Sequence, residues 1–156
     1  MPVKTTELIA GIGPYPTFTG RLIVIEPNRR WQAAINWQAA TPDHGWLRLT
    51  HAASARIVEM EWTDDSIWMR DNQAASPDWR PVSAKELAMH GIVLTPQALT
   101  AILLGAMPQT FKSRQPHIWE GKHAGSMMRL QWSQQSKRLT VTDITYGRKA
   151  ILIIQD

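Results

Sequence analysis

The chain contains no cysteine. This absence excludes a disulfide framework, a thiol nucleophile and a cysteine-ligated metal. No G-x-S-x-G, P-loop or G-x-G-x-x-G motif occurs, and in Gly11-Ile12-Gly13-Pro14 a proline stands where a phosphate cradle needs a backbone amide. We therefore expect no catalytic residues and no cofactor, and we predict that the protein is not an enzyme.

Long hydrophobic runs are also missing. The short apolar stretch near the start, residues 8–12, is interrupted by Gly11 and followed by Gly13, Pro14 and Pro16. It is too short for a signal peptide or a membrane-spanning helix. If the protein is exported, we expect that its targeting segment has been removed before residue 1.

The composition of the chain indicates one folded domain. The 156 residues are 44% hydrophobic and 19% charged, which indicates a chain that buries a core rather than a disordered one. Eight tryptophans stand against two tyrosines and two phenylalanines, and tryptophan suits positions where one ring edge meets water or a lipid headgroup. The net charge of +4 favours anionic surfaces but is far from that of a typical nucleic-acid binder.

Alternating apolar and polar residues predict two groups of strands. We expect residues 1–17 to form an irregular lead-in and residues 18–156 to form a single domain. The predicted strands of the first group are 19–26, 31–37, 47–50, 56–62 and 67–69, and those of the second are 128–132, 138–142 and 150–154.

The period changes to that of helices between the two groups. Ser83-Ala84-Lys85-Glu86 is a capping box that predicts a short helix ending at Gly91. Thr95-Pro96 places proline at the first helical position after a threonine cap. The apolar residues that follow at helical spacing are Leu99, Ile102, Leu103 and Met107, and Gly105 to Pro108 ends the run.

The predicted fold class is mostly β (α+β): an open antiparallel β half-barrel with a helical lid inserted between two meanders. The alternation places a set of large apolar residues on the concave face, where they either fill a core or line a ligand cavity. These candidate cavity residues are Trp37, Leu47, Leu49, Val58, Met60, Trp62, Leu99, Ile102, Leu103, Met128, Leu130 and Trp132.

Several motifs resemble the LolB family of outer-membrane lipoprotein receptors. They are Gly20-Arg21-Leu22, the strand from Trp31 to Trp37, Leu47-Arg48-Leu49-Thr50, the run from Gly91 to Pro96, and Leu103-Leu104-Gly105 with Pro108. Tyr146-Gly147-Arg148 is similar to the closing strands of the wider LolA/LolB group. The resemblance covers most of the chain from residue 18 onward.

The resemblance implies an incomplete β-barrel with a helical lid that holds lipoprotein acyl chains in a hydrophobic cavity. It also implies a periplasmic location, with an outer-membrane anchor if a lipidated cysteine precedes residue 1. The family carries a protruding leucine in the turn after its "LxLT" strand, and the matching residue here is Ala53. Alanine has less apolar surface to bury in a bilayer than leucine, so the free energy of its insertion is less favourable by on the order of 1–2 kcal/mol.

Charged residues in the predicted turns form two rims. Arg29 and Arg30 lie in the first turn, while Asp43 and the pair Asp64-Asp65 lie in the second and fourth. Successive turns of a meander alternate ends, so one rim is predicted to be basic and the other acidic. Arg148, Lys149 and Lys122 share one end of the second meander. We expect Arg29, Arg30 and Arg148 to meet lipid headgroups, or else to be ordinary charged turn residues.

Two other groups of ionisable residues have ordinary explanations. Alternation places Glu59 and Glu61 on the outer face, where we expect them to be solvated. His117, Glu120 and His123 form an H-x-x-E-x-x-H pattern, but Gly121 and Gly125 favour a solvated hairpin tip over a metal site. The remaining histidines, His44, His51 and His90, are expected to be structural or solvent-facing.

The leading hypothesis is a monomeric periplasmic carrier or receptor for lipidated or amphiphilic ligands. Its expected partners are lipid or lipoprotein acyl chains, with a membrane surface or an acidic carrier protein as further candidates. Two alternatives remain open. The same fold with a filled core would serve as an assembly module that binds a protein partner through its rim. A single-stranded nucleic-acid binder would use tryptophan platforms between basic turns.

Overall fold

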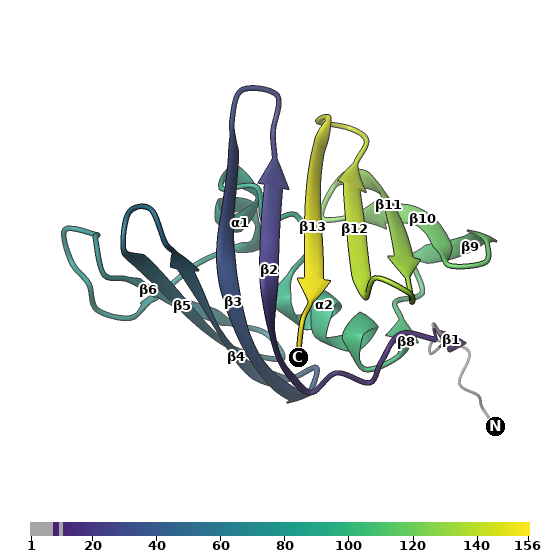
Figure 1. The fold of residues 1–156 in the computed structure, drawn as a ribbon, viewed down its shortest axis with the longest axis horizontal. Helices are drawn as coiled ribbons and strands as arrows, with labels where there is room; N and C mark the ends of the chain where they lie inside the picture. Colours follow the sequence, from purple (N-terminus) through teal and green to yellow (C-terminus); the bar gives the residue numbers. More distant parts are fainter. Residues whose placement is uncertain (1–7, 10) are drawn as a thin grey trace.

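The computed structural model describes residues 8, 9 and 11–156, and its main element is one antiparallel sheet of eleven strands that curls without closing (Figure 1). In space the strands follow the order β7-β6-β5-β4-β3-β2-β13-β12-β11-β10-β9. Their bounds are β2 Thr17–Ile25, β3 Arg30–Thr41, β4 His44–His51, β5 Arg56–Thr63, β6 Ile67–Asp71, β7 Arg80–Pro81, β9 Phe111–Gln115, β10 Ile118–His123, β11 Ser126–Ser133, β12 Arg138–Asp143 and β13 Arg148–Ile154.

The sheet consists of two meanders joined by their first and last strands. β2 pairs with β13 along six residue pairs, from Ile25 opposite Lys149 to Gly20 opposite Ile154. Gly20 is required at this junction, because an added Cβ would lie 2.1 Å from the carbonyl oxygen of Ile153. The predicted order of meander, helices and meander is confirmed, as is the open half-barrel.

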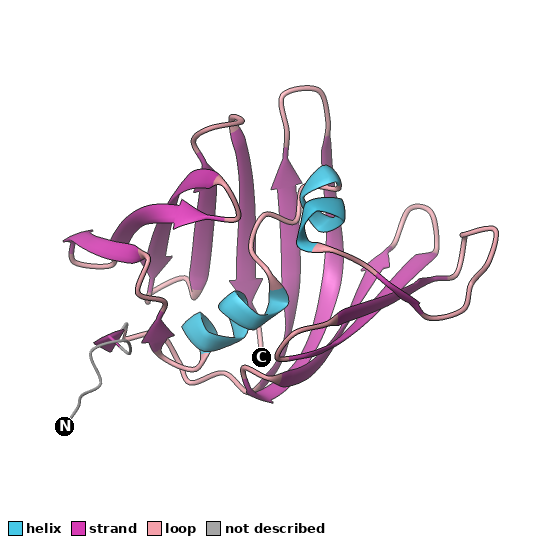
Figure 2. Cartoon of the chain, turned by 180° about the vertical axis from the view of Figure 1, so that it is seen from behind, coloured by secondary structure: helices cyan, strands magenta, loops and turns pink. Residues whose placement is uncertain are grey.

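Two short helices occupy the concave side of the sheet (Figure 2). They are α1, Ala84–Met89, and α2, Pro96–Leu103. Both predicted N-caps are present: the Ser83 hydroxyl accepts from the Glu86 backbone N–H at 3.0 Å, and the Thr95 hydroxyl accepts from that of Ala98 at 3.2 Å. The carboxylate of Glu86 forms an ion pair with Arg80 at 2.7 Å.

The helical prediction was wrong at its end. α2 stops at Leu103, and Met107 lies in the short strand β8, Ala106–Met107. Gly105 adopts a φ of +98°, which a continuing helix cannot contain. β8 pairs with β1, Leu8–Ile9, so the segment predicted as an irregular lead-in contains a short strand; residues 1–7 and 10 of that segment lie outside the described residues.

The prediction of a hairpin tip around Gly121 was also wrong. Residues Ile118–His123 form strand β10, which pairs with β9 and β11. Gly121 stands where β9 approaches, since an added Cβ would lie 1.9 Å from the carbonyl oxygen of Thr110. In β9 only Phe111 is buried and the other four residues are exposed, so this edge strand lacks the alternation by which strands are predicted.

The core lies between the concave face and the helices. Trp37 and Trp62 are each 1% exposed, and their ring centroids are 5.1 Å apart. Ile102 and Leu103 on α2 are fully buried against this face. No helix in the described part of the chain is long and apolar enough to cross a membrane.

Candidate ligand-binding cavity

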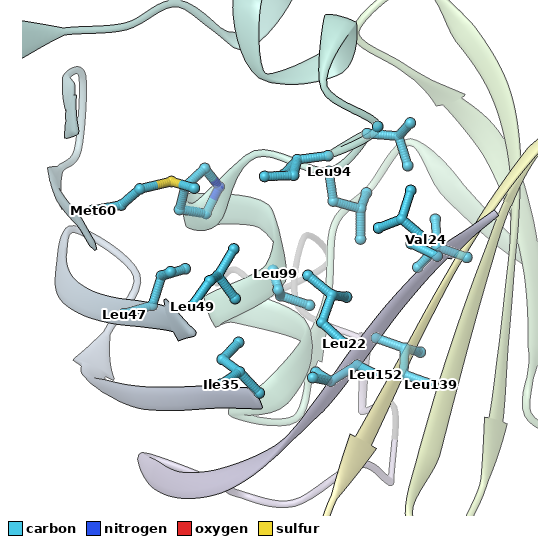
Figure 3. Close-up of a pocket in the computed structure, with 16 residues that line it drawn as sticks. Leu22, Val24, Ile35, Leu47, Leu49, Met60, Leu94, Leu99, Leu139 and Leu152 are labelled. Carbon is cyan, nitrogen blue, oxygen red and sulfur yellow. The ribbon is translucent and has the colours of Figure 1, made fainter. Parts of the chain in front are cut away.

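An apolar cavity of about 60 Å³, here called the inner cavity, lies between the concave face and the segment that joins α1 to α2 (Figure 3). Hydrocarbon dominates its walls. The lining residues are Leu22, Val24, Ile35, Leu47, Leu49, Met60, Gly91, Ile92, Val93, Leu94, Pro96, Leu99, Leu139, Val141, Ala150 and Leu152. They come from six neighbouring strands and from the lid segment, which is defined here as residues 91–99.

The lid segment approaches the sheet closely because of Gly91. This residue follows the C-cap of α1, His90, and has a φ of +86°, and an added Cβ would lie 2.6 Å from the side chain of Val24. Val24 is fully buried beneath it. The backbone of Gly91 thus forms part of the cavity wall where a larger residue would push the lid away from β2.

A second cavity, the mouth cavity, has a volume of about 230 Å³ and a mixed lining. Its lining residues are Arg29, Arg30, Trp31, Leu49, His51, Arg56, Val58, Met60, Met69, Leu87, His90 and Ile92. It shares Leu49, Met60 and Ile92 with the inner cavity, so the two adjoin. Together they have an apolar interior and a polar, basic entrance.

Two arginines of the entrance are held by carboxylates. Arg29 pairs with Glu26, and the Nε and Nη2 atoms of Arg56 donate to Asp71 at 3.0 and 2.5 Å. Burial acts to raise the pKa of Asp71, but hydrogen bonds from Arg56 and from the Gln73 backbone outweigh it, so the pKa lies below its ordinary value. Arg30 belongs to no ion pair within the described residues.

His51 lies at the entrance against the ring of Trp31, with 5.2 Å between ring centroids. Burial lowers the pKa of His51, and the nearby charge of Arg56 lowers it further. The only sequence signal for its position was its even spacing from Leu47 and Leu49, which places it on the concave face.

The predicted cavity residues divide into two groups. Leu47, Leu49, Met60 and Leu99 line the inner cavity, and Val58 lines the mouth cavity. The others belong to the buried core and line neither cavity: Trp37, Trp62, Ile102, Leu103, Met128, Leu130 and Trp132. Several lining residues were not predicted from the sequence, although those on the strands alternate: Leu22, Val24, Ile35, Ile92, Val93, Leu94, Leu139, Val141, Ala150 and Leu152.

The three predicted rim arginines also differ in position. Arg29 and Arg30 line the mouth cavity. Arg148 pairs with the fully buried Asp143 at 2.8 Å and donates to the backbone carbonyl of Ala88, so it joins α1 to the sheet. The opposite end carries Asp43, Asp64 and Asp65 as expected, but Lys137 lies in a turn at that end too.

The prediction that Glu59 is solvated was wrong. Glu59 faces outward, as alternation requires, yet it is only 7% exposed, because Arg48 and Arg70 pair with it at 3.3 and 2.7 Å and cover it. Burial acts to raise the pKa of Glu59, but the two arginines outweigh it and lower the pKa. Glu61 is exposed as predicted.

The H-x-x-E-x-x-H pattern does not converge on one point. His117 precedes β10 and His123 ends it, so about 20 Å of extended chain separates them. Glu120 pairs instead with Arg129 and Arg114, whose hydrogen bonds and charges lower its pKa. Burial lowers the pKa of His123, whose Nε2 accepts from the Thr95 backbone N–H at 3.4 Å. No group of three potential metal ligands occurs among the described residues.

Comparison with known proteins finds no matching family model and no matching curated protein. The resemblance to LolB therefore rests on the motifs in the sequence.

Proposed function

We propose that this protein binds lipidated or otherwise amphiphilic ligands by burial and release, without bond chemistry. The observation that carries the proposal is the junction of the two cavities: an apolar interior opens into an entrance lined by Arg29, Arg30 and Arg56. An acyl chain suits the first and a polar headgroup the second. On the resemblance to LolB, we further propose that it works in the periplasm as a carrier or receptor.

The small volume of the inner cavity determines how an acyl chain can bind there. A cavity of roughly 150 Å³ accepts benzene and typical ligand pockets hold about 300–1,000 Å³, whereas the inner cavity holds about 60 Å³. A long acyl chain therefore enters only when the lid segment moves away from the sheet. A hydrogen bond holds the lid segment to the end of β5: the side-chain amide of Gln97 donates to the Thr63 carbonyl at 2.8 Å.

Native mass spectrometry of protein purified without delipidation tests the proposal. We expect co-purifying fatty acid or phospholipid, or, after delipidation, binding of a fluorescent acyl chain that dodecanoate displaces. An apo mass together with no binding of the fluorescent chain would contradict the proposal.

A variant that narrows the inner cavity makes the test specific. Leu99→Phe enlarges a residue that lines the cavity, and we expect it to weaken acyl binding at least tenfold. Ile151→Phe adds the same ring to β13, at a position on neither cavity lining, and serves as the matched control. Equal loss in both variants would show that the effect is not one of cavity volume.

The small inner volume favours a second candidate function. With Trp37, Trp62 and the α2 residue Leu103 fully packed in the core, the same fold can act as an assembly module with a filled core. An apo mass together with no binding of the fluorescent acyl chain would favour it. The nucleic-acid alternative has less support, because stacking requires exposed rings and four of the eight tryptophans (Trp37, Trp62, Trp119 and Trp132) are buried.

A further inference from the structure

Large apolar side chains are exposed mainly at one end of the molecule. Of the five that are exposed in the described residues, Trp68 is the exception, and the other four lie near the end of α1 and the turn that joins β12 to β13. Met89 is 69% exposed, Tyr146 61%, Ile144 46% and Met127 40%. Exposure of this extent for four neighbouring residues needs an explanation beyond chance.

Hydrogen bonds and a shared groove join these four residues into one surface. The Ile144 backbone N–H donates to the Met127 carbonyl at 2.8 Å, and the Met127 N–H donates to the Thr145 hydroxyl at 2.9 Å. Met89 and Tyr146 line one open groove between α1 and the sheet. The turn of residues 144–147, at the top of Figure 1, thus connects the two pairs.

Three exposed lysines are interleaved with the apolar side chains. Lys122 is the cross-strand partner of Met127, so both point to the same face. Lys85 lies one helical turn before Met89, and Lys149 follows the turn that carries Tyr146. None of the three belongs to an ion pair within the described residues, while the nearby carboxylates of Asp143 and Glu86 are paired with Arg148 and Arg80.

We propose that this surface, the rim patch (Lys85, Met89, Lys122, Met127, Ile144, Tyr146 and Lys149), docks the protein on an anionic lipid surface. Apolar side chains that enter the headgroup region and lysines that meet anionic headgroups are the two components of peripheral membrane binding. The turn of residues 26–29, which borders the mouth cavity, lies at the same end, because Ile25 pairs with Lys149. Docking therefore brings the cavity entrance close to the lipid.

Charge distribution favours lipid over an acidic protein as the occupant. The lysines come from α1, β10 and β13 and surround the apolar residues, with no unpaired carboxylate of this surface among the described residues to orient a particular partner. A diffuse array of positive charge around an apolar centre is complementary to a surface whose negative charge is also diffuse.

Co-sedimentation with vesicles tests the proposal. We expect binding to vesicles of equal parts phosphatidylcholine and phosphatidylglycerol, weak binding to phosphatidylcholine alone, and loss of binding at high salt. The triple variant Lys85→Glu, Lys122→Glu, Lys149→Glu should lower the partition coefficient by more than about a hundredfold, since each basic residue near an anionic surface contributes roughly a fivefold factor and each glutamate adds repulsion. Met89→Ser with Tyr146→Ser should also weaken binding.

Matched variants define the outcomes that overturn the proposal. A control triple variant makes the same change in charge at exposed residues outside the patch: Lys112→Glu, Lys137→Glu, Arg138→Glu. It should retain binding, as should a variant with Lys→Arg at the three patch lysines. Three outcomes contradict the proposal. They are equal binding to both vesicle types, unchanged binding of the patch variant, and a loss of binding in the control charge variant equal to that in the patch variant. Leu99→Phe should bind vesicles normally, so failure of docking and failure of ligand binding remain distinguishable.

Discussion

At the scale of single residues, the buried ion pair of Arg148 and Asp143 is the contact with the largest expected energetic consequence. Asp143 is fully buried, and Arg148 also donates to the Ala88 carbonyl on α1. We predict that Arg148→Met lowers the free energy of unfolding by about 3 kcal/mol, because it leaves a buried carboxylate without its partner. Urea denaturation measures the loss.

The control for this prediction is a double variant. Asp143→Asn with Arg148→Met removes the charge that Arg148→Met leaves unpaired, while the Asn side-chain oxygen can still accept from the Tyr146 backbone N–H, as Asp143 does at 3.2 Å. We expect it to recover more than half of the lost stability. No recovery would indicate that the loss comes from the contact with α1 instead.

Histidine burial predicts how stability depends on pH. Burial lowers the pKa of His123 below its ordinary 6.5, so the unfolded chain takes up a proton at a higher pH than the folded chain does. Stability is therefore fully present above about pH 7, falls as the pH drops through 6.5, and levels off below the folded-state pKa. His51, whose pKa is also lowered, adds to the same trend.

The variant His123→Gln tests this dependence, because glutamine does not titrate and can still accept from the Thr95 N–H. We expect thermal unfolding between pH 7 and pH 5 to show a smaller decrease in Tm for this variant than for the parent protein. A decrease of the same size would mean that other groups cause it.

At the scale of elements, the lid segment depends on Gly91. We predict that Gly91→Ala lowers stability by about 1–3 kcal/mol, because alanine strains a backbone at φ +86° and its Cβ meets Val24 at 2.6 Å. Gly125→Ala is the matched control, with a similar φ of +83° and nothing within 4 Å of the added atom. Thermal unfolding of both variants separates the close contact from the backbone strain, and equal losses would rule out the contact.

At the scale of the whole molecule, ligand binding should raise global stability. A ligand present at a hundred times its Kd adds about 2.7 kcal/mol, which corresponds to a Tm higher by roughly 5–10 °C for a chain of this size. We expect dodecanoate to produce this shift in the parent protein and not in Leu99→Phe. A calorimetric Tm that does not respond to dodecanoate would favour the assembly module.

Local patterns in the sequence determined much of the fold. The alternation from Trp31 to Trp37 and from Val58 to Trp62 identified the concave face, and Ser83 and Thr95 marked the starts of the helices. These features are readable because side-chain direction along a strand and the capping of a helix depend on a few adjacent residues. The exposed edge strand β9 has no such pattern and was missed.

The tertiary structure decided which buried residues fill the core and which line a cavity. Leu49 and Trp62 alternate in the same way, yet only Leu49 faces the space under the lid segment, because that space depends on how α2 sits across the sheet. Glu59 is covered by arginines from β4 and β6, and the rim patch unites α1 with β10, β11 and β13. The cover of Glu59 depends on the register of three consecutive strands, β4, β5 and β6. The inner cavity and the rim patch depend on the pairing of β2 with β13, strands more than a hundred residues apart, and no local pattern records a contact over that distance.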